Sequence, residues 1–291
     1  MIPVVAVTEP WFALAEGPVW DAAGGRVLWI DIPEGLVLVG RLVGDHLAIE
    51  TQHHFDSFVG AVALAADGSL LVAETYGLTC LQPDGTRIAG PTLVRPENEE
   101  RLNDATCDAH GRLLVGTLSL QSAHHSQRLI QIGAASVEVL DDDLGLSNGL
   151  AFSPDGTLLY SVDSIPGTVW VRDYDQGSGA VGPRRLVLLL GDGTPDGMCA
   201  DASGNLWIAI WGRGQVRCFS PAGKLLDTIT VPAPHTSSVA FVGSDLDQLL
   251  ITTARTDLSP AQLDEFPQSG SLFLARPGCV GLPTHLWSPA L

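Results

Sequence analysis

A unit that recurs six times along the chain constrains the fold more than any other feature. Each copy opens with a polar or small residue, reaches a turn about eight positions later and continues into a short apolar strand. The turn glycines of the first five copies are separated by 43, 43, 45 and 48 residues; they are Gly25, Gly68, Gly111, Gly156 and Gly204. A period of about 40–50 residues built from short strands is typical of a β-propeller with one four-stranded blade per repeat.

The repeats predict a single all-β domain, a six-bladed β-propeller over residues 1–291. The chain is 45% hydrophobic and contains 32 glycines and 19 prolines, which suits a large core with many tight turns. One blade cannot bury its faces alone, so the repeats must stack into one body. The last blade needs a closing strand, and two segments are candidates, Val4–Val7 and Ser271–Leu274. A short helix is expected over Pro260–Phe266, with Ser259 as its N-cap.

The composition excludes several classes of partner. Fifteen basic and 33 acidic residues give a formal charge of −18, which argues against nucleic-acid binding. The five cysteines are odd in number and form no CxxC motif, so we expect reduced thiols. The N-terminal segment lacks the features of a signal peptide, and the apolar runs are too short to span a membrane. We therefore expect a cytoplasmic protein with neither nucleic acid nor a membrane as partner.

The opening residues of the repeats predict a binding site on the propeller axis. They share one register, and four of them carry a carboxylate or amide oxygen: Glu16, Asn103, Asn148 and Asp196. In a ring of blades, these side chains must point to one place. An all-oxygen set suits Ca²⁺, Mg²⁺ or Mn²⁺, and less specifically Zn²⁺ or Fe²⁺. The alternative is that Asn and Asp here cap turns by bonding their own backbone, but the common register favours the metal site.

The third repeat adds a candidate for substrate binding. Arg101 stands two residues before Asn103, on the same strand face, where a guanidinium can bind the oxygens of a polar ligand. Asp104 either pairs with Arg101 or bonds the backbone. Long polar connections at 96–100 and 120–128 flank this repeat, as expected of a binding face. The second connection carries His124 and His125, either as surface residues or as part of a lid.

Several motifs together resemble one protein family, and they follow one another in order over nearly the whole chain. They are EGPVW from Glu16, LWIDIP from Leu28, RLNDATCDAHGRLLVGT from Arg101, LSNGLAFSPDG from Leu146, YSVD from Tyr160, PDGMCADASGNLWIA from Pro195 and TTAR from Thr252. The sequence is similar to the family of senescence marker protein (regucalcin), gluconolactonases and luciferin-regenerating enzyme, and within it to the bacterial sugar lactonases.

The resemblance implies roles for individual residues. It implies a six-bladed propeller with one divalent cation on the axis, bound by Glu16, Asn148 and Asp196. It also implies that Arg101 and Asn103 contact the substrate. An acidic substrate-binding residue of the animal members is replaced here by Gln121, in the segment GTLSLQS. We therefore expect Gln121 to bind substrate and to change which lactone is preferred.

The resulting functional prediction is metal-dependent hydrolysis of a sugar lactone to its aldonic acid. The small-molecule substrate is an aldonolactone, such as a glucono-, xylono- or arabinono-lactone, and the enzyme is a carboxylic-ester hydrolase. Asp196 is expected to act as general base for the attacking water as well as a metal ligand. Two alternatives remain open. One is hydrolysis of an organophosphate or another ester, and the other is a non-catalytic calcium-binding propeller.

Overall fold

Six four-stranded antiparallel sheets surround a central axis in the computed structural model, which describes residues 2–121, 126–134 and 136–288. The first two sheets consist of β2 (Ala15–Asp21), β3 (Arg26–Asp31), β4 (Leu36–Val43) and β5 (His46–His54), then β6 (Val59–Leu64), β7 (Leu70–Glu74), β8 (Gly77–Leu81) and β9 (Arg87–Thr92). The next two are β10 (Glu100–Cys107), β11 (Leu113–Ser119), β12 (Gln127–Ile132) and β13 (Val137–Leu144), then β14 (Ser147–Phe152), β15 (Leu158–Asp163), β16 (Thr168–Asp173) and β17 (Arg185–Leu189). The last two are β18 (Thr194–Ala200), β19 (Leu206–Trp211), β20 (Gln215–Phe219) and β21 (Leu225–Thr230), then β22 (Thr236–Val242), β23 (Gln248–Thr253), β24 (Phe273–Ala275) and β1 (Val4–Ala6).

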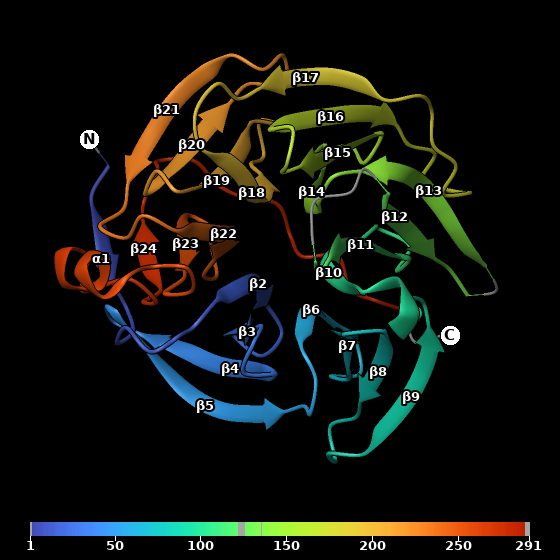
Figure 1. The fold of residues 1–291 in the computed structure, drawn as a ribbon, viewed down its shortest axis with the longest axis horizontal. Helices are drawn as coiled ribbons and strands as arrows, with labels where there is room; N and C mark the ends of the chain where they lie inside the picture. The colour runs from blue at the N-terminus through green and yellow to red at the C-terminus, as the bar shows by residue number, and fades with distance from the viewer. Residues whose placement is uncertain (1, 122–125, 135, 289–291) are drawn as a thin grey trace.

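This arrangement confirms the predicted six-bladed propeller. The first strand of each repeat is innermost, so β2, β6, β10, β14, β18 and β22 surround the centre (Figure 1). The fourth strand of each of the first five blades lies at the rim. Each repeat therefore forms one blade, and the residues that open the repeats meet near the axis.

Both ends of the chain close the ring, so the two candidate closing segments are not alternatives. In the sixth blade, β24 pairs with β23 on one side and with β1 on the other, with Val5 opposite Leu274. Beyond β1, the Val7 nitrogen donates to the Leu272 oxygen at 2.8 Å. The Val7 oxygen accepts from the Leu47 nitrogen of β5 at 2.7 Å, which ties the closing strand to the first blade.

Every innermost strand has an irregularity at the residue that opens its repeat. The register between first and second strand shifts in all six blades, for example between Glu16 and Val19, between Asn148 and Leu150, and between Pro195 and Met198. Such a bulge bends the strand and redirects a side chain, and bulges are common next to active sites. The repeated bulge explains how these residues can face the axis at one end of strands that are otherwise apolar.

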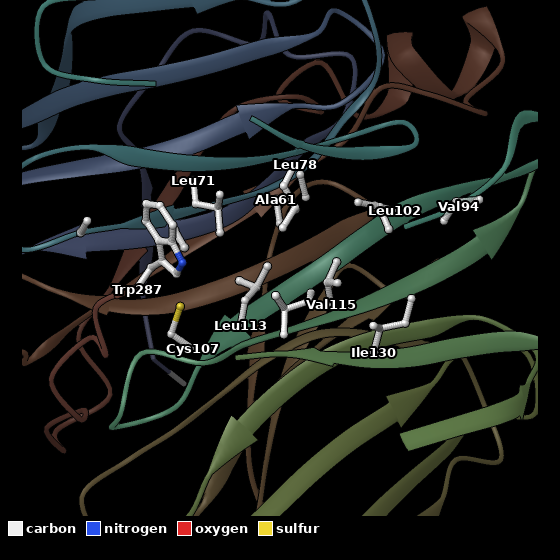
Figure 2. Packing of buried hydrophobic residues seen from close by; sticks show 14 residues of the cluster. Ala61, Leu71, Leu78, Val94, Leu102, Cys107, Leu113, Val115, Ile130 and Trp287 are labelled. Carbon is white, nitrogen blue, oxygen red and sulfur yellow. The ribbon is translucent and has the colours of Figure 1, made fainter. Parts of the chain in front are cut away.

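Neighbouring blades pack through apolar side chains on both sheet faces. One cluster joins the second and third blades, and it includes Leu71, Leu102, Leu113 and Ile130 (Figure 2). Trp287 lies in the same cluster, although it comes from the C-terminal segment. The core is therefore divided among the interfaces between blades, as expected for a propeller.

The C-terminal segment crosses one face of the propeller. The predicted binding loops lie on the opposite face. The dark red trace of this segment crosses the ring close to its centre in Figure 1. The Gly281 nitrogen donates to the Leu246 oxygen of the sixth blade, the Thr284 hydroxyl to the Trp20 oxygen of the first, and the Trp287 nitrogen to the Leu64 oxygen of the second. The repeat pattern did not predict this segment.

Two smaller expectations are confirmed, and a third observation concerns the helices. Helix α1 (Pro260–Glu265) begins after Ser259, whose hydroxyl accepts from the Gln262 nitrogen in a capping box. The five cysteines form no disulfide; they are Cys80, Cys107, Cys199, Cys218 and Cys279. Within the described residues, no helix is long and apolar enough to cross a membrane.

Candidate active site

Three oxygen-bearing side chains from three blades lie together on the axis. Glu16 of β2, Asn148 of β14 and Asp196 of β18 are all buried at the bulges of their innermost strands. A side chain on the glycine after Asn148 or after Asp196 would collide with the next blade. A Cβ atom at Gly149 would lie 2.4 Å from the Asp196 oxygen, and one at Gly197 would lie 2.1 Å from the Ser238 hydroxyl. The SNG and PDG motifs therefore bring the inner strands close together.

The two axial carboxyl groups strongly disfavour their charged forms. Burial raises the pKa of Glu16 well above its ordinary value, and the negative charges of Asp196 and Asp104 raise it further. Burial and the charge of Asp104 likewise raise the pKa of Asp196. Among the described residues, no basic side chain lies within ion-pair distance of either carboxylate. Buried carboxylates are normally paired with a base or bound to a metal, which makes this pair a candidate for binding a cation.

Hydrogen bonds leave one oxygen free on each of the three side chains. Glu16 Oε2 accepts from the Gly17 nitrogen at 2.8 Å, and Asp196 Oδ1 accepts from Asn148 Nδ2. Asn148 Nδ2 also donates to the Ser164 hydroxyl at 3.2 Å. The described part of the chain supplies no donor to Glu16 Oε1, Asn148 Oδ1 or Asp196 Oδ2. These atoms form a hard oxygen set that fits a divalent cation such as Ca²⁺, Mg²⁺ or Mn²⁺.

A second shell of hydrogen bonds holds Asn148 beside Asp196. The Ser164 hydroxyl donates to the Pro195 oxygen at 2.7 Å, so its lone pair remains available to accept from Asn148 Nδ2. This bond fixes which face of the amide is nitrogen and directs Oδ1 away from Ser164. No cluster of three or more His, Cys, Asp and Glu side chains forms a metal site among the described residues.

Arg101 and Asn103 form one unit on β10 at the same end of the axis. Arg101 Nη1 donates to Asn103 Oδ1 at 2.9 Å and to the Leu102 oxygen at 2.8 Å. Asn103 Nδ2 donates to the Ser147 oxygen of the next blade at 3.0 Å. Burial lowers the pKa of Arg101 to about 10, and the charges of Glu16 and Asp196 oppose this effect. The amide of Asn103 is thus used to hold Arg101, whose Nη2 and Nε have no hydrogen-bond acceptor in the described part of the chain.

Asp104 is a third acidic residue of the site. It does not pair with Arg101; its carboxylate accepts from the Ala105 nitrogen at 2.8 Å. Burial raises the pKa of Asp104 to about 6. Asp104 also lines a cavity of about 180 Å³ that runs along the axis below the site and is bounded at its far end by 282–285. It therefore adds negative charge beneath Glu16 and Asp196, a contribution that the sequence analysis missed.

Gln121 lies apart from the buried group. It is exposed on the loop after β11, its backbone nitrogen donates to the Ser119 hydroxyl at 3.3 Å, and its amide donates to the Glu99 carboxylate. Its role in substrate binding stays a prediction. His124 and His125, for which a lid role was one interpretation, lie outside the described residues.

The other repeats contribute differently to the axis. The second blade has Gly60 at the opening position, where a Cβ atom would lie 2.5 Å from the Leu102 oxygen. The sixth has Ser237, whose hydroxyl donates to the Ala15 oxygen of the first blade at 2.6 Å. Beside it, His235 is buried and stacks on Trp211, with ring centroids 4.0 Å apart. His235 was not predicted as a site residue from the sequence, although its position two residues before Ser237 matches that of Arg101 before Asn103.

Comparison with known proteins gives a consistent picture. The family model described as SMP-30/Gluconolactonase/LRE-like region matches residues 14–255. The chain is 33% identical over 289 residues to the pentonolactonase XacC of Haloferax volcanii, covering 96% of each chain. It is 32% identical over 272 residues to the putative sugar lactone lactonase YvrE of Bacillus subtilis, covering 90% of this chain and 91% of the other. A solved structure from Agrobacterium tumefaciens, described as the calcium-binding protein regucalcin, superposes with a TM-score of 0.93 at 27% identity, covering 99% of this chain and 98% of the other.

Proposed function

Because the chain belongs to the SMP-30/gluconolactonase/LRE-like family, we propose that it hydrolyses a sugar lactone to the corresponding aldonic acid. The observation that carries the proposal is the axial group of Glu16, Asn148 and Asp196. Two buried carboxylates without a basic partner among the described residues lie together on the propeller axis. They lie next to a buried arginine whose Nη2 and Nε donors have no acceptor in that part of the chain. Pentono- and hexonolactones are the substrates to test first, since the relatives are named as lactonases of sugars and pentoses.

Glu16, Asn148 and Asp196 would hold one divalent cation through the three oxygens that lack donors. When bound, such a cation polarises a carbonyl oxygen and lowers the pKa of a nearby water. The relative from Agrobacterium tumefaciens is described as calcium-binding, and calcium favours carboxylate and amide oxygens. Calcium is therefore the first cation to test, followed by Mg²⁺, Mn²⁺, Zn²⁺ and Fe²⁺.

In the proposed reaction, Asp196 accepts a proton from the attacking water. Asn148 occupies Oδ1, so Oδ2 would serve both roles: one of its two lone pairs would bind the cation and the other would accept the proton. The water oxygen bonds to the lactone carbon, the ring C–O bond breaks, and the proton passes from Asp196 to the departing alkoxide, which becomes a hydroxyl of the aldonic acid. Atoms and charge balance without any further reactant.

Arg101 would bind the oxygen atoms of the lactone through Nη2 and Nε. These donors are pre-organised, because Asn103 and the Leu102 oxygen already fix Nη1. A guanidinium held in a buried site stabilises developing negative charge without having to reorganise first. Asn103 would act mainly by positioning Arg101, which refines the expectation that both residues contact substrate.

One assay separates the lactonase from the two other functions that were considered. Glucono-, xylono- and arabinono-lactone and paraoxon would be added separately in a pH-indicator assay, with and without EDTA. Proton release from a sugar lactone that EDTA abolishes is the expected result. Preferential release from paraoxon would identify a phosphoester hydrolase. Calcium binding without turnover of any ester would identify a calcium-binding propeller and overturn the proposal.

A further inference from the structure

We infer that His235 binds substrate: its Nε2 atom accepts a hydrogen bond from a hydroxyl group of the lactone, across the mouth of the axial site from Arg101. The inference rests on the proposed lactonase function and adds to it a residue that orients the sugar.

The repeat register places His235 and Arg101 at equivalent positions. His235 stands two residues before Ser237, and Arg101 stands two residues before Asn103, each on or directly before an innermost strand. Residues i and i+2 of a strand share a face, so both side chains lie above the axial layer. The third and sixth blades are opposite one another in a ring of six, as β10 and β22 are in Figure 1.

In the other blades, the residues at the position equivalent to Arg101 and His235 are mostly apolar. Two residues before the opening position, three of the other four blades have an apolar side chain and the fifth blade has a threonine; these residues are Leu14, Phe58, Leu146 and Thr194. A ligand that crosses the mouth therefore meets a cationic donor on one side and an imidazole on the other, with mostly apolar groups between them.

Two contacts fix the orientation and tautomer of His235. Its ring lies 4.0 Å from the ring of Trp211 at an interplanar angle of 13°, and the two residues also form a backbone bridge between the fifth and sixth blades. His235 Nδ1 lies 3.0 Å from the Thr256 oxygen. A carbonyl oxygen can only accept, so the hydrogen must be on Nδ1, and Nε2 carries the lone pair.

This arrangement leaves Nε2 as an acceptor to which the described part of the chain offers no donor. The two ring nitrogens flank Cε1 and their bonding directions diverge, so Nε2 is directed away from the Thr256 oxygen. In the inferred complex this atom is directed toward the axis, where a substrate hydroxyl would donate to it. Burial lowers the pKa of His235, which favours the neutral ring, whereas the Thr256 hydrogen bond and the charge of Asp257 act in the opposite direction.

Arg101 and His235 together select a chemical class of substrate. Arg101 offers donors, which suit the carbonyl, ring and product carboxylate oxygens, whereas His235 offers an acceptor, which suits a hydroxyl. A polyhydroxylated lactone can form hydrogen bonds with Arg101 and with His235 at the same time. A lactone that lacks the relevant hydroxyl leaves Nε2 unpaired in the complex, and a site built around a polar contact discriminates strongly against such an analogue.

The test compares kcat/KM for gluconolactone with kcat/KM for its singly deoxygenated analogues. We expect the wild-type protein to prefer the parent lactone by about tenfold over at least one analogue. His235→Phe keeps an aromatic ring on Trp211 but removes both nitrogens, so it should lower kcat/KM for the parent about tenfold and abolish that preference. His235→Gln restores an acceptor oxygen and should recover part of it.

His285→Phe is the matched control. His285 Nδ1 also lies against a backbone oxygen, that of Cys107, at 3.2 Å, but at the far end of the axial cavity. This variant should keep the preference of the wild-type protein. An equal loss on parent and analogues in His235→Phe, or a wild-type protein that does not discriminate among them, would overturn the assignment of His235 alone. No turnover of any sugar lactone by the wild-type protein would overturn the proposed function and this inference together.

Discussion

At the scale of single residues, the site combines acidic groups that lack basic partners among the described residues with an arginine held by an amide. Glu16 and Asp196 raise one another's cost of ionisation, and Asp104 adds to it. Arg101 attracts both carboxylates electrostatically, but its Nη1 atom donates hydrogen bonds to Asn103 and to the Leu102 oxygen. In the proposed function, the negative charge would bind a cation, and the guanidinium donors that have no acceptor among the described residues would bind the substrate.

Arg101→Ala should lower kcat/KM for the lactone tenfold or more while the metal content stays the same. The physical reason is the loss of charge-assisted hydrogen bonds worth about 1.5–3 kcal/mol. Asn103→Ala should share part of the loss, because Arg101 Nη1 then loses its side-chain acceptor. Arg276→Ala, which breaks an exposed ion pair with Asp247, is the control and should leave turnover unchanged. Loss of metal in Arg101→Ala would show that the roles are assigned wrongly.

The chelated protein should lose stability as the pH rises from about 4 toward 7. Burial raises the folded-state pKa of Asp104 to about 6, and the pKa values of Glu16 and Asp196 are raised as well. A carboxyl group whose pKa is raised in the folded protein stabilises the folded state fully when the pH is below its unfolded-state pKa of about 4. This stabilisation is lost as the pH rises through the folded-state pKa.

Asp104→Asn should therefore make the chelated protein more stable at pH 7, by roughly 1–2 kcal/mol in urea unfolding. Asp155→Asn is the opposite case, because hydrogen bonds from Ser153 and Thr157 lower the pKa of Asp155, and it should bring no such gain. A chelated protein whose stability is the same at pH 5 and pH 7 would show that burial and mutual repulsion do not raise the pKa values of these carboxyl groups.

The sequence alone identified the axial residues because the repeat fixes their register. It did not identify how they pair, since hydrogen bonds such as those of Asn103 with Arg101 and Ser147 depend on side-chain conformations that no periodicity encodes. The role of Asp104 was missed for the same reason. His235 could have been identified from the sequence, because an alignment of the residues that precede each opening position places it in the blade opposite Arg101.

At the scale of elements, the inner strands and the C-terminal segment do different work. The bulge in each inner strand turns one residue toward the axis, and the strands beyond it pack the blades together. The C-terminal segment forms no repeat, yet it contacts the first, second, third and sixth blades on the far face. Its contacts are isolated bridges and buried side chains, which have no periodic signal in the sequence.

Trp287→Ala should lower the free energy of unfolding by about 3–5 kcal/mol, the usual cost of emptying a buried tryptophan site. Trp287 is buried among Leu71, Cys107 and their neighbours, as Figure 2 shows, and its nitrogen donates to the Leu64 oxygen at 2.8 Å. Urea unfolding measures the change. Trp11→Ala is the control, since Trp11 is 66% exposed, and it should alter stability by less than about 0.5 kcal/mol. Equal effects of the two substitutions would contradict the role given to the C-terminal segment.

At the scale of the whole molecule, the ring depends on one three-residue strand. The repeats predicted six blades because each copy carries its own turn and strand signals. They left the closure undecided, because β1 and β24 are three residues each and their pairing spans the full length of the chain. The sixth blade is thus built from both ends, and the geometry of the axis depends on its being complete.

Removal of residues 1–7 should destabilise the protein and cause it to associate. Without β1, the edge of β24 exposes unpaired backbone groups, which can pair with another chain. Size-exclusion chromatography and thermal unfolding measure both effects. Removal of residues 1–3, which leaves Val4–Ala6 in place, is the control and should have a much smaller effect. If the two truncated proteins behave alike, the ring does not need β1 for closure.

The central claim is that lactone hydrolysis depends on one cation bound at the axis. The most direct test is to titrate the chelated protein with Ca²⁺, and then with the other candidate cations, while calorimetry follows binding and a pH indicator follows hydrolysis. We predict one site per chain, with activity rising in proportion to its occupancy, and loss of both in Glu16→Gln but not in Glu34→Gln, which changes an exposed loop carboxylate. Full activity in the chelated protein, or unchanged binding by Glu16→Gln, would contradict the account.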